Sequence, residues 1–578
     1  MINLTQEIGL AAYHLATQFQ TESAIAVGIS AAAALPATFE QKPIAKLFQL
    51  ATIAGITVGP CLMWVANTAA MELSGKQVFS KNDFLQFGLI ALASFIGYVG
   101  VTRLSSPVIE AFLQKLRCPS LLERIRHEDA REIHKALSKK VINFDPRKYF
   151  HFKKGFFAGL DENCRPIYLN WKDIDEQHVA VEGPTRFGKG VFIQSSISQQ
   201  IQRGSFVVVL DPKPDQWLGH VAREACKNAN RPFHFIDLNA PEFQINLFQR
   251  ATESEIRELL TAGLSLEELG HPTDFYKAEQ QDQVETIAFE EALKSPTFAG
   301  IFKRHSKRLR DVPKNGARGL ETKLRQLSRL KSVNATGGPN LAELVQQGGC
   351  VYVTGSMTDR TVIRAQRMLL LRLIQIGKKR NFEAGKDLPM HIIVDEARVF
   401  LSNITSQALA TAAGFGTLLT LAFQSEDDLR NVPQDLDKDS MVSSVKTNCQ
   451  VRLLFKQTGE AAEKAAASSG QIDVDIESRA VNRNLYGVEK FGSERHVQQQ
   501  RTHFIDSNVF QNLPPRCGVL FEIRSLPRLC FTSPITVKKE LLNITAYPGE
   551  ELNCLNLNLD ESPPQFDLPM EDYCNDDH

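Results

Sequence analysis

The chain has 578 residues, and its 66 Lys and Arg residues balance 66 Asp and Glu residues. A single ordinary core does not accommodate this length, so we expect two or more domains. The zero net charge indicates no class of partner, although the distribution of charge along the chain does. The ten cysteines form no CxxC pair, which argues against a zinc site or a disulfide framework and favours reduced thiols in a cytosolic body.

The N-terminal region differs in kind from the rest of the chain. Residues 47–71 and 84–102 contain no charged side chain, and each run is long enough to cross a bilayer. A weaker Ala-rich run at 23–39 leaves open a third span or an interfacial helix. Basic residues from Arg103 onward place the large C-terminal body in the cytoplasm by the positive-inside rule. We therefore predict a multi-pass membrane anchor at 1–103, with a pair of buried core helices as the alternative.

A helical linker is predicted at 104–150, and short apolar runs at 156–160, 166–169 and 178–181 then predict strands. A glycine-bounded loop follows, with the GxxxxGK spacing of a phosphate-binding P-loop and a helix-like run after it. Backbone N–H groups and the helix N-terminus of such a loop hold a polyphosphate, and its lysine reaches the β- and γ-oxygens. The residues that we expect to hold the nucleotide are Gly183, Pro184, Thr185, Arg186, Phe187, Gly188, Lys189, Gly190 and Val191.

Gly190 occupies the position at which a Ser or Thr hydroxyl usually ligates Mg²⁺. Two interpretations stay open. Either the loop has lost its metal and its activity, or water or another side chain, such as Thr185, completes the metal shell.

Further apolar runs at 205–210, 233–237 and 350–353 predict buried strands. Separated by helical segments, they indicate an α/β fold with a parallel sheet covered on both faces and ligands at the carboxyl ends of the strands. Residues 251–345 read as an all-helical insertion whose later half is strongly basic. Such a surface could bind nucleic-acid phosphates without sequence preference, or it could be a solvated helix face or a dock for an acidic protein.

Two strands beyond the insertion end in polar residues. The run at 390–394 leads into Asp395 and Glu396, and the run at 417–423 leads into Gln424. In an ATPase, Asp395 would hold Mg²⁺ through water and Glu396 would polarise the attacking water. Gln424 stands where RecA-like motors place a sensor of the γ-phosphate. The alternative is an ordinary strand end whose acids cap the next helix.

The end of the chain is acidic. Residues 541–578 contain no Lys or Arg, and they accumulate Asp and Glu around a Pro-Pro pair. This composition predicts a flexible tail that either meets a partner or only solubilises the chain.

The loop sequence goes beyond a generic P-loop. Residues 183–190 resemble the phosphate loop of the type IV secretion system coupling proteins, the TraG/TraD class of conjugative DNA-transfer ATPases, several of which also carry Gly after the lysine. Further similarity lies at 211–213, 395–396, 424–429 and 448–470, and it extends from the membrane spans to about Ile535. The order of the parts is the most specific signal: spans, P-loop, helical insertion, Walker B strand and sensor Gln.

This resemblance implies a RecA-like motor at 151–250 and 346–540, and a bacterial inner-membrane protein with its bulk in the cytoplasm. It also implies ATP and Mg²⁺ as cofactors and assembly as a homo-oligomer, a hexamer by analogy. The implied partners are single-stranded DNA bound without sequence preference, relaxase or relaxosome proteins, and components of a type IV secretion channel.

The chain departs from the family at 410–416, where relatives often carry a basic residue, so Arg398 and Arg430 become the candidates for an arginine finger. Two other functions stay open. One is a membrane receptor that binds nucleotide and recruits substrates without hydrolysis. The other is an FtsK-like DNA translocase, although no C-terminal winged helix is recognisable.

Overall fold

The computed structural model describes residues 142–551 with gaps at 268–273, 293, 312–317, 381–387, 433–436 and 484–488. It also describes residues 130–138 and scattered positions between 64 and 96. The chain divides into two compact units. The smaller unit contains Met1–Glu128 and Gly470–Phe504, and the larger unit contains Asp129–Ser469 and Ile505–His578.

The predicted membrane runs at 23–39, 47–71 and 84–102 lie wholly or mostly outside the described residues, as does much of the predicted linker. Among the positions that are described, no helix combines the length and the apolar character needed to cross a bilayer.

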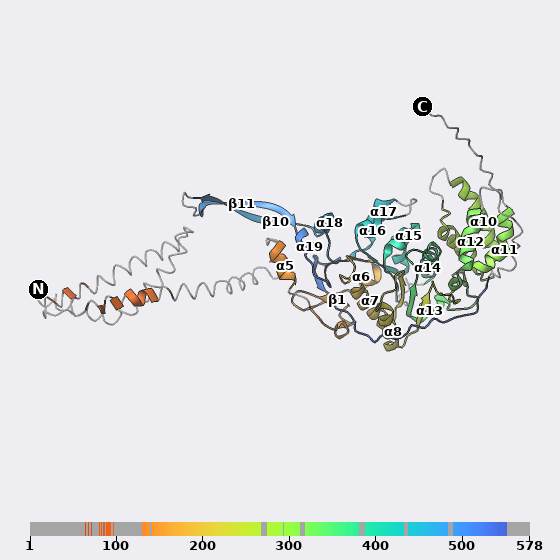
Figure 1. Ribbon diagram of the computed structural model, residues 1–578, viewed down its shortest axis with the longest axis horizontal. Helices are drawn as coiled ribbons and strands as arrows, with labels where there is room; N and C mark the ends of the chain where they lie inside the picture. Colours follow the sequence, from red (N-terminus) through yellow and green to blue (C-terminus); the bar gives the residue numbers. More distant parts are fainter. Residues whose placement is uncertain are drawn as a thin grey trace, which may run out of the picture. The chain divides into compact units, whose positions relative to one another are not determined.

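The larger unit is built on an 11-stranded sheet with the order β2-β1-β13-β12-β9-β3-β8-β7-β4-β6-β5 (Figure 1). The run from β9 to β5 is parallel. The remaining pairings, from β9 through β12, β13 and β1 to β2, are antiparallel. Its strands are β1 (Phe156–Leu160), β2 (Pro166–Leu169), β3 (Val179–Glu182), β4 (Phe206–Asp211), β5 (Phe233–Asp237), β6 (Gly349–Thr354), β7 (Met390–Val394), β8 (Thr417–Phe423), β9 (Val451–Leu454), β12 (Cys517–Phe521) and β13 (Arg528–Phe531). The predicted α/β class with a parallel sheet is confirmed.

Strand β4 shows why these apolar runs become central strands. Successive side chains of a strand point to opposite faces, so a strand covered on both sides must be apolar throughout. Val207 and Val209 join the buried cluster that contains the apolar faces of α7 (Lys189–Arg203) and α8 (Leu218–Asn228). Val208 and Leu210 join the cluster that contains α14 (Arg360–Lys378) and α15 (Asn403–Thr411). The sheet is therefore sandwiched between two helical layers.

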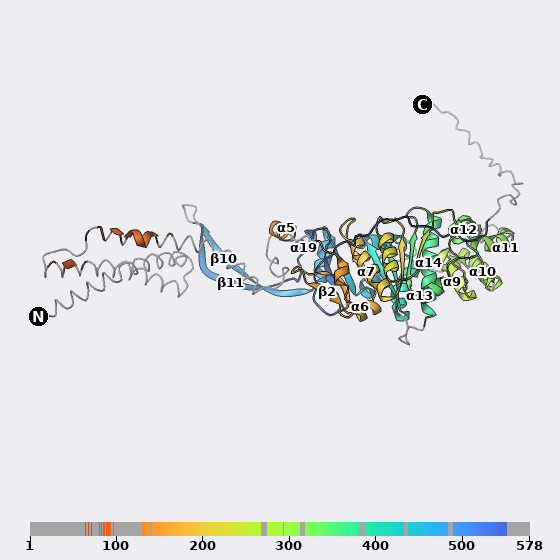
Figure 2. The same ribbon diagram turned by 90° about the horizontal axis from the view of Figure 1, so that it is seen from below.

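The described residues between β5 and β6 are helical and form no strand, although isolated bridges join Asn246 to Asn334 and Ala335 to Gly549. Figures 1 and 2 both place α10, α11 and α12 together at one end of this unit, beyond α14. Leu320 and Phe298 belong to the same buried cluster as α14, so the insertion shares its core with the sheet. Its helices are α9 (Glu253–Gly263), α10 (Asp274–Glu291), α11 (Phe298–Asp311), α12 (Arg318–Arg329), η2 (Lys331–Val333) and α13 (Leu341–Gln347).

Short helices complete this unit. They are α5 (Ala130–Ser138), η1 (Pro146–Tyr149), α6 (Trp171–Glu176), η4 (Ala397–Val399), η5 (Ala412–Phe415), α16 (Glu426–Arg430), α17 (Lys438–Asn448), α18 (Glu460–Ser468) and α19 (Ser507–Gln511).

Residues 532–551, which we call the C-terminal strap, connect β13 to the helical insertion. Ile535 donates its N–H to the Gln194 side chain on α7 at 3.1 Å, and the side chains of Arg223 and Glu540 form an ion pair. Further along, Tyr547 and Glu550 donate backbone N–H groups to the carbonyls of Phe243 and Asn334. Residues 541–551, which composition assigns to the start of the flexible tail, are therefore bonded to the folded body, and only 552–578 lie outside the described residues.

The described part of the smaller unit includes a long antiparallel hairpin of β10 (Gln471–Arg483) and β11 (Glu489–His503), paired from Gln471 with His503 outward. We expected these residues to belong to the motor at 346–540, and we did not predict a hairpin there.

Candidate functional site

The predicted P-loop joins β3 to α7, as the strand–loop–helix pattern requires. Strand β3 lies between β9 and β8. The loop is anchored to both neighbours, since Gly183 donates its N–H to the Phe423 carbonyl at 3.2 Å and Phe455 donates to the Glu182 carbonyl at 2.8 Å. Helix α7 begins at Lys189, so its free N–H groups face the loop.

Both bounding glycines adopt backbone angles that other residues rarely adopt, with φ of 152° at Gly183 and 125° at Gly188. Space is restricted there as well, because Phe455, a fully buried residue just beyond β9, approaches both glycines closely. A Cβ atom on Gly183 would lie 2.6 Å from the Phe455 Cβ, and one on Gly188 would lie 2.7 Å from its Cε1. Phe455 thus supports the loop, a role that its place in the family-like stretch at 448–470 did not reveal.

Lys189 is almost completely buried, with 8% of its surface exposed. Its Nζ donates a hydrogen bond to the Gly183 carbonyl at 2.6 Å. Burial lowers the pKa of Lys189, while the negative charges of Glu396 and Asp395 oppose this shift. An ammonium group has three donors, so the contact with Gly183 leaves two for phosphate oxygens.

Asp395 lies at the carboxyl end of β7, the strand that is separated from β3 only by β8. Its backbone N–H donates to the Leu210 carbonyl at 3.0 Å, and its Oδ1 accepts the N–H of Glu396 at 3.1 Å. Burial raises the pKa of Asp395 to about 7, and the charges of Asp211 and Glu396 raise it further. A cation placed among these carboxylates would remove the repulsion between them.

Glu396 and Gln424 are brought together by the ends of β7 and β8. The Gln424 side-chain amide donates to the Glu396 Oε1 at 3.3 Å and to its Oε2 at 3.4 Å, and the Gln424 N–H donates to Asp428 Oδ2 at 2.9 Å. Glu396 has a left-handed backbone with φ of 49°, which is strained for a non-glycine residue. This strained turn orients the carboxylate toward Gln424.

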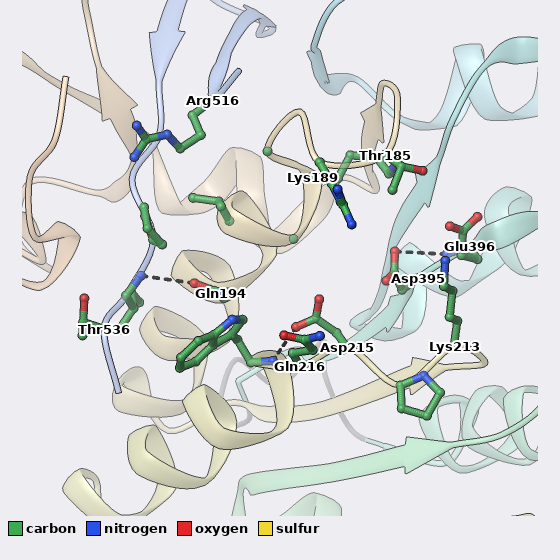
Figure 3. Close-up of a pocket in the computed structure, with 18 residues that line it drawn as sticks. Thr185, Lys189, Gln194, Lys213, Asp215, Gln216, Asp395, Glu396, Arg516 and Thr536 are labelled. Atoms are coloured by element: carbon green, nitrogen blue, oxygen red, sulfur yellow. Dashed lines mark hydrogen bonds between the residues drawn. The ribbon is translucent and has the colours of Figure 1, made fainter. Parts of the chain in front are cut away.

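A cavity of about 750 Å³ collects most of the predicted residues (Figure 3). Loop residues from Thr185 to Val191, except Phe187, line it together with Asp395 and Glu396. Gly183 and Pro184 do not line it, and Gln424 reaches it only through Glu396. The volume lies within the usual range of pockets for small molecules.

The opposite wall of the cavity was not predicted. It consists of Gln194, Lys213–Trp217, Arg516 and Pro534–Thr536. Arg516 is held beside the loop, since its N–H donates to the Phe187 carbonyl at 2.7 Å and its guanidinium donates to Asn143 at 2.8 Å. The sequence carried a partial signal for this wall in Asp211-Pro212-Lys213, and none for Arg516.

The candidates for an arginine finger, Arg398 and Arg430, are absent from the lining of this cavity, and Arg430 pairs with Asp439 at 3.4 Å. A finger that acts across subunits would not line the cavity of its own chain, so both stay predictions.

The donor set fits Mg²⁺ bound together with a nucleotide. Within the described residues, no three His, Cys, Asp or Glu side chains converge on a metal site of their own. Mg²⁺ needs no such cage, because it usually binds one or two carboxylates together with substrate phosphates and water. Asp395 and Glu396 beside the P-loop provide that arrangement.

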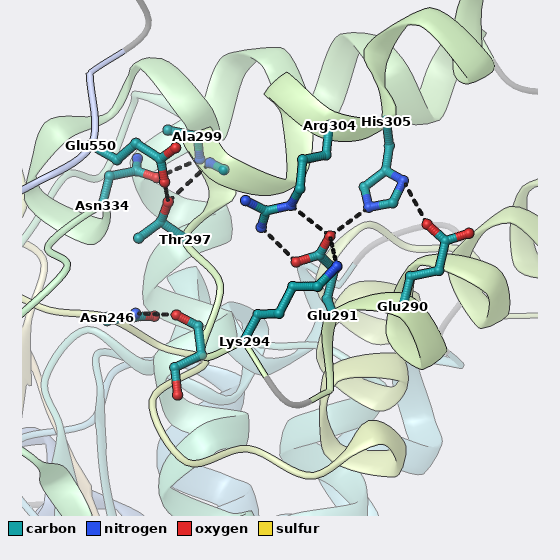
Figure 4. Close-up of polar contacts among 12 residues, drawn as sticks. Asn246, Glu290, Glu291, Lys294, Thr297, Ala299, Arg304, His305, Asn334 and Glu550 are labelled. Atoms are coloured by element: carbon teal, nitrogen blue, oxygen red, sulfur yellow. Dashed lines mark hydrogen bonds and ion pairs between the residues drawn. The ribbon is translucent and has the colours of Figure 1, made fainter.

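The basic half of the insertion, a candidate DNA surface, is partly neutralised by ion pairs (Figure 4). Arg304 donates to both carboxylate oxygens of Glu291, at 2.7 and 2.5 Å, and His305 Nε2 lies 2.7 Å from Glu291 Oε1. Burial alone would raise the pKa of Glu291, but these hydrogen bonds lower it overall. Arg308 also forms an ion pair with Glu290, and Lys331 forms one with Glu551. The surface available for phosphates is therefore smaller than the count of basic residues suggests.

Asn334 secures the insertion at its centre. It is completely buried, accepts the N–H of Ala299 at 2.7 Å and donates to the carbonyls of Leu327 and Leu330 at 2.9 and 2.8 Å. These bonds join the start of α11 to the end of α12.

No family model matches the chain. Mobilization protein A of Escherichia coli is 28% identical over 342 residues, which make up 57% of this chain. The match spans 62% of the length of that protein. Among solved structures, the unbound monoclinic form of the bacterial conjugative coupling protein TrwBdeltaN70 has a TM-score of 0.50 and 13% identity, and the match covers 68% of this chain and 92% of that one. Plasmid coupling protein TrwB in complex with ADP and Mg²⁺ has a TM-score of 0.48 and 14% identity, with 70% and 95% covered.

Fold and site together define a P-loop nucleotide-binding protein. The resemblance to conjugative coupling proteins that the sequence indicates is confirmed at the level of the fold, by the similarity to TrwBdeltaN70.

Proposed function

We propose that this protein is a membrane-anchored ATPase that drives conjugative DNA transfer by coupling a relaxase–DNA or protein substrate to a type IV secretion channel. The observation that carries the proposal is the meeting of Lys189, Asp395 and Glu396 in one nucleotide-sized cavity. The fold shared with a conjugative coupling protein and the similarity to a mobilization protein support the choice of transfer system.

Each predicted residue has a physical task in this proposal. The P-loop N–H groups bind the phosphates of ATP, and Lys189 stabilises the charge between the β- and γ-phosphates. Asp395 holds Mg²⁺, which neutralises phosphate charge when bound. Glu396 positions and polarises the attacking water.

Gln424 links the reaction to the rest of the motor. Its amide contacts the Glu396 carboxylate, and its N–H is bound by Asp428 on α16. A change in the position of Glu396 on hydrolysis would therefore be passed to α16. This route makes Gln424 a sensor whose signal leaves the site along α16.

The proposal includes a bacterial inner-membrane location, with the motor in the cytoplasm, and assembly as a homo-oligomer, a hexamer by analogy with the class. It also includes sequence-independent binding of single-stranded DNA. The charge pattern of the N-terminal region supports the inner-membrane location. Exposed basic residues of the insertion, such as Lys303 and Lys307, support the binding of DNA.

A receptor that binds nucleotide without hydrolysing it is the second candidate. Gly190 favours it, because the loop lacks the usual metal-binding hydroxyl. An FtsK-like translocase would share the motor but finds no specific support in the structure.

The deciding experiment measures ATP hydrolysis by the full chain in detergent, with and without single-stranded DNA. Glu396→Gln serves as the blank, since it keeps the size of the side chain but loses its charge. Hydrolysis that DNA stimulates and that Glu396→Gln abolishes would establish the motor. Nucleotide binding without turnover, in particles shown to be assembled, would favour the receptor.

Transfer in cells provides the second test. We expect Lys189→Ala to abolish conjugative transfer, while Lys172→Ala retains it. Lys172 is the matched control because it lies on α6, exposed and outside the cavity, 3.9 Å from Glu176. A Lys189→Ala strain that transfers DNA normally would refute the motor assignment.

A further inference from the structure

Gly190 leaves an open space at the start of α7. It is the second residue of the helix, and within 4 Å a Cβ atom on it would meet only the Oδ2 of Asp215, at 4.0 Å. A serine hydroxyl would extend from that Cβ into the same space. The oxygen of Asp215 thus faces the position from which a P-loop normally presents its metal-binding hydroxyl.

Asp215 is held in place by the turn between β4 and α8. Asp211 organises this turn, because its Oδ1 accepts the N–H of Lys213 at 3.1 Å and its Oδ2 accepts the N–H of Asp215 at 2.8 Å. The Tyr352 hydroxyl donates to the same Oδ2 of Asp211 at 2.5 Å and fixes its orientation. The backbone of Asp215 is therefore held by two buried residues, Asp211 and Tyr352, although Asp215 itself is exposed.

The two carboxylate oxygens of Asp215 have different roles. Its Oδ1 accepts the N–H groups of Trp217 and Leu218, at 2.7 and 2.8 Å, and so caps α8. Its Oδ2 is the oxygen that faces Gly190. Figure 3 shows the carboxylate of Asp215 directed into the cavity, between α7 and Asp395.

We propose that Asp215 supplies the magnesium ligand that Gly190 cannot supply. The inference rests on the proposed function and concerns the same cavity. A carboxylate oxygen is a preferred ligand of Mg²⁺, and it brings a negative charge that a hydroxyl lacks. Thr185, which the sequence offered as a substitute, also lines the cavity, but Asp215 is the residue that faces position 190. In this proposal the oxygen ligand of Mg²⁺ comes from Asp215 instead of from residue 190, and the site still binds the metal.

The test compares nucleotide affinity in Mg²⁺ and in EDTA, using a fluorescent ATP analogue and the full chain in detergent. Asp215→Asn keeps the Oδ1 acceptor that caps α8 but removes the charge. Asp359→Asn is the matched control, since Asp359 caps α14 through bonds to Thr361 and Val362, at 2.7 and 3.2 Å, outside the cavity. The double variant Gly190→Ser with Asp215→Asn restores a hydroxyl at the usual position.

The measured quantity is the nucleotide affinity in Mg²⁺ divided by the nucleotide affinity in EDTA. We expect this ratio to fall about tenfold in Asp215→Asn, because losing a group that holds a metal typically weakens metal binding by this factor or more. Affinity in EDTA should stay unchanged. Asp359→Asn should behave as the wild type, and the double variant should regain much of the ratio. Mn²⁺ paramagnetic resonance of the nucleotide-bound chain gives a second readout, since Asp215→Asn should weaken Mn²⁺ binding while Asp359→Asn should not.

Three results would overturn the inference in distinguishable ways. A wild-type ratio that persists in Asp215→Asn would refute the role of Asp215 and leave the proposed function intact. A loss of affinity in EDTA as well would assign Asp215 to the architecture of the site. A wild-type chain that binds no nucleotide in either condition would refute the proposed function and the inference together.

Discussion

Two glycines of the P-loop, two positions apart, should respond in opposite ways to the same substitution. Gly188 has a φ of 125°, and a Cβ on it would lie 2.7 Å from Phe455 Cε1 and 3.1 Å from the Arg516 Cα. Gly190 lies within the first turn of α7, where the nearest atom to a Cβ is 4.0 Å away. Alanine at position 188 would therefore have a strained φ angle and too little room for its Cβ, whereas alanine at position 190 would meet neither problem.

The size of the effect follows from these contacts. An alanine at a strained φ costs about 1–3 kcal/mol, and forcing a methyl group against a packed ring and a backbone atom costs about 1–3 kcal/mol more. We expect Gly188→Ala to lower the free energy of unfolding by about 2–6 kcal/mol, the sum of the two costs. Gly190→Ala should leave it unchanged or raise it by up to about 1 kcal/mol, because alanine favours a helix over glycine.

Urea unfolding of the full chain in detergent, followed by tryptophan fluorescence, compares the two variants with the wild type. Nucleotide affinity in EDTA is the second measurement, and Gly188→Ala should weaken it because the loop can no longer close over the phosphates. Equal losses of stability in the two variants would refute the role of Phe455 as the support of the loop. So would a Gly188→Ala variant that is as stable as the wild type.

Three further predictions concern other parts of the molecule. Burial raises the pKa of Glu182 to about 8, so this carboxyl ionises in the unfolded chain above about pH 4.5 but stays protonated in the folded chain until about pH 8. The free energy of unfolding therefore falls as the pH rises between these two values; Glu182→Gln should raise it by about 3 kcal/mol at pH 7 and by little at pH 4, and equal effects at both would contradict the reasoning. Gln424→Ala should lower the turnover of ATP at least about tenfold with little change in nucleotide affinity, and a change in affinity alone would exclude a sensor role. Asn334→Ala should destabilise the helical insertion by about 2–4 kcal/mol and expose it to limited proteolysis, since it leaves three buried backbone groups without their partner.

Much of the site could be predicted because its parts follow buried parallel strands. Strands β3, β7 and β8 read as continuous apolar runs, and their polar successors meet at one edge of the sheet. Lys189, Asp395 and Glu396 therefore line one cavity, as their positions after these strands indicate. Gln424 does not line the cavity and touches Glu396 instead, whereas a direct sensor of the γ-phosphate would line it.

The opposite wall could not be predicted in the same way. Arg516 and Pro534–Thr536 reach the cavity from the far end of the chain, and no local pattern encodes a contact over that separation. Asp215 follows a strand like the other acids, but a single acid in a turn resembles an ordinary helix cap, and it does serve as one. Its position opposite Gly190 depends on the packing of β4 beside the P-loop helix, which no local sequence pattern encodes.

Composition predicted a flexible tail from residue 541, but the C-terminal strap extends to residue 551. An acidic segment without Lys or Arg indicates a flexible tail, yet Tyr547 and Glu550 are held through backbone N–H groups, which side-chain composition does not report. The β10–β11 hairpin was not predicted, because β11 has few apolar residues and so lacks the alternating pattern that marks a strand.

The pairing of β1 with β13 has a consequence for the birth of the protein on the ribosome. Leu160 pairs with Phe531, which is synthesised about 370 residues later. At ordinary rates of translation this interval lasts on the order of 20–70 s. Phe455 and Arg516, which pack against the P-loop, also arrive late in synthesis. We therefore expect the P-loop of the nascent chain to lack its packing partners, and to bind nucleotide poorly, until the last strands emerge.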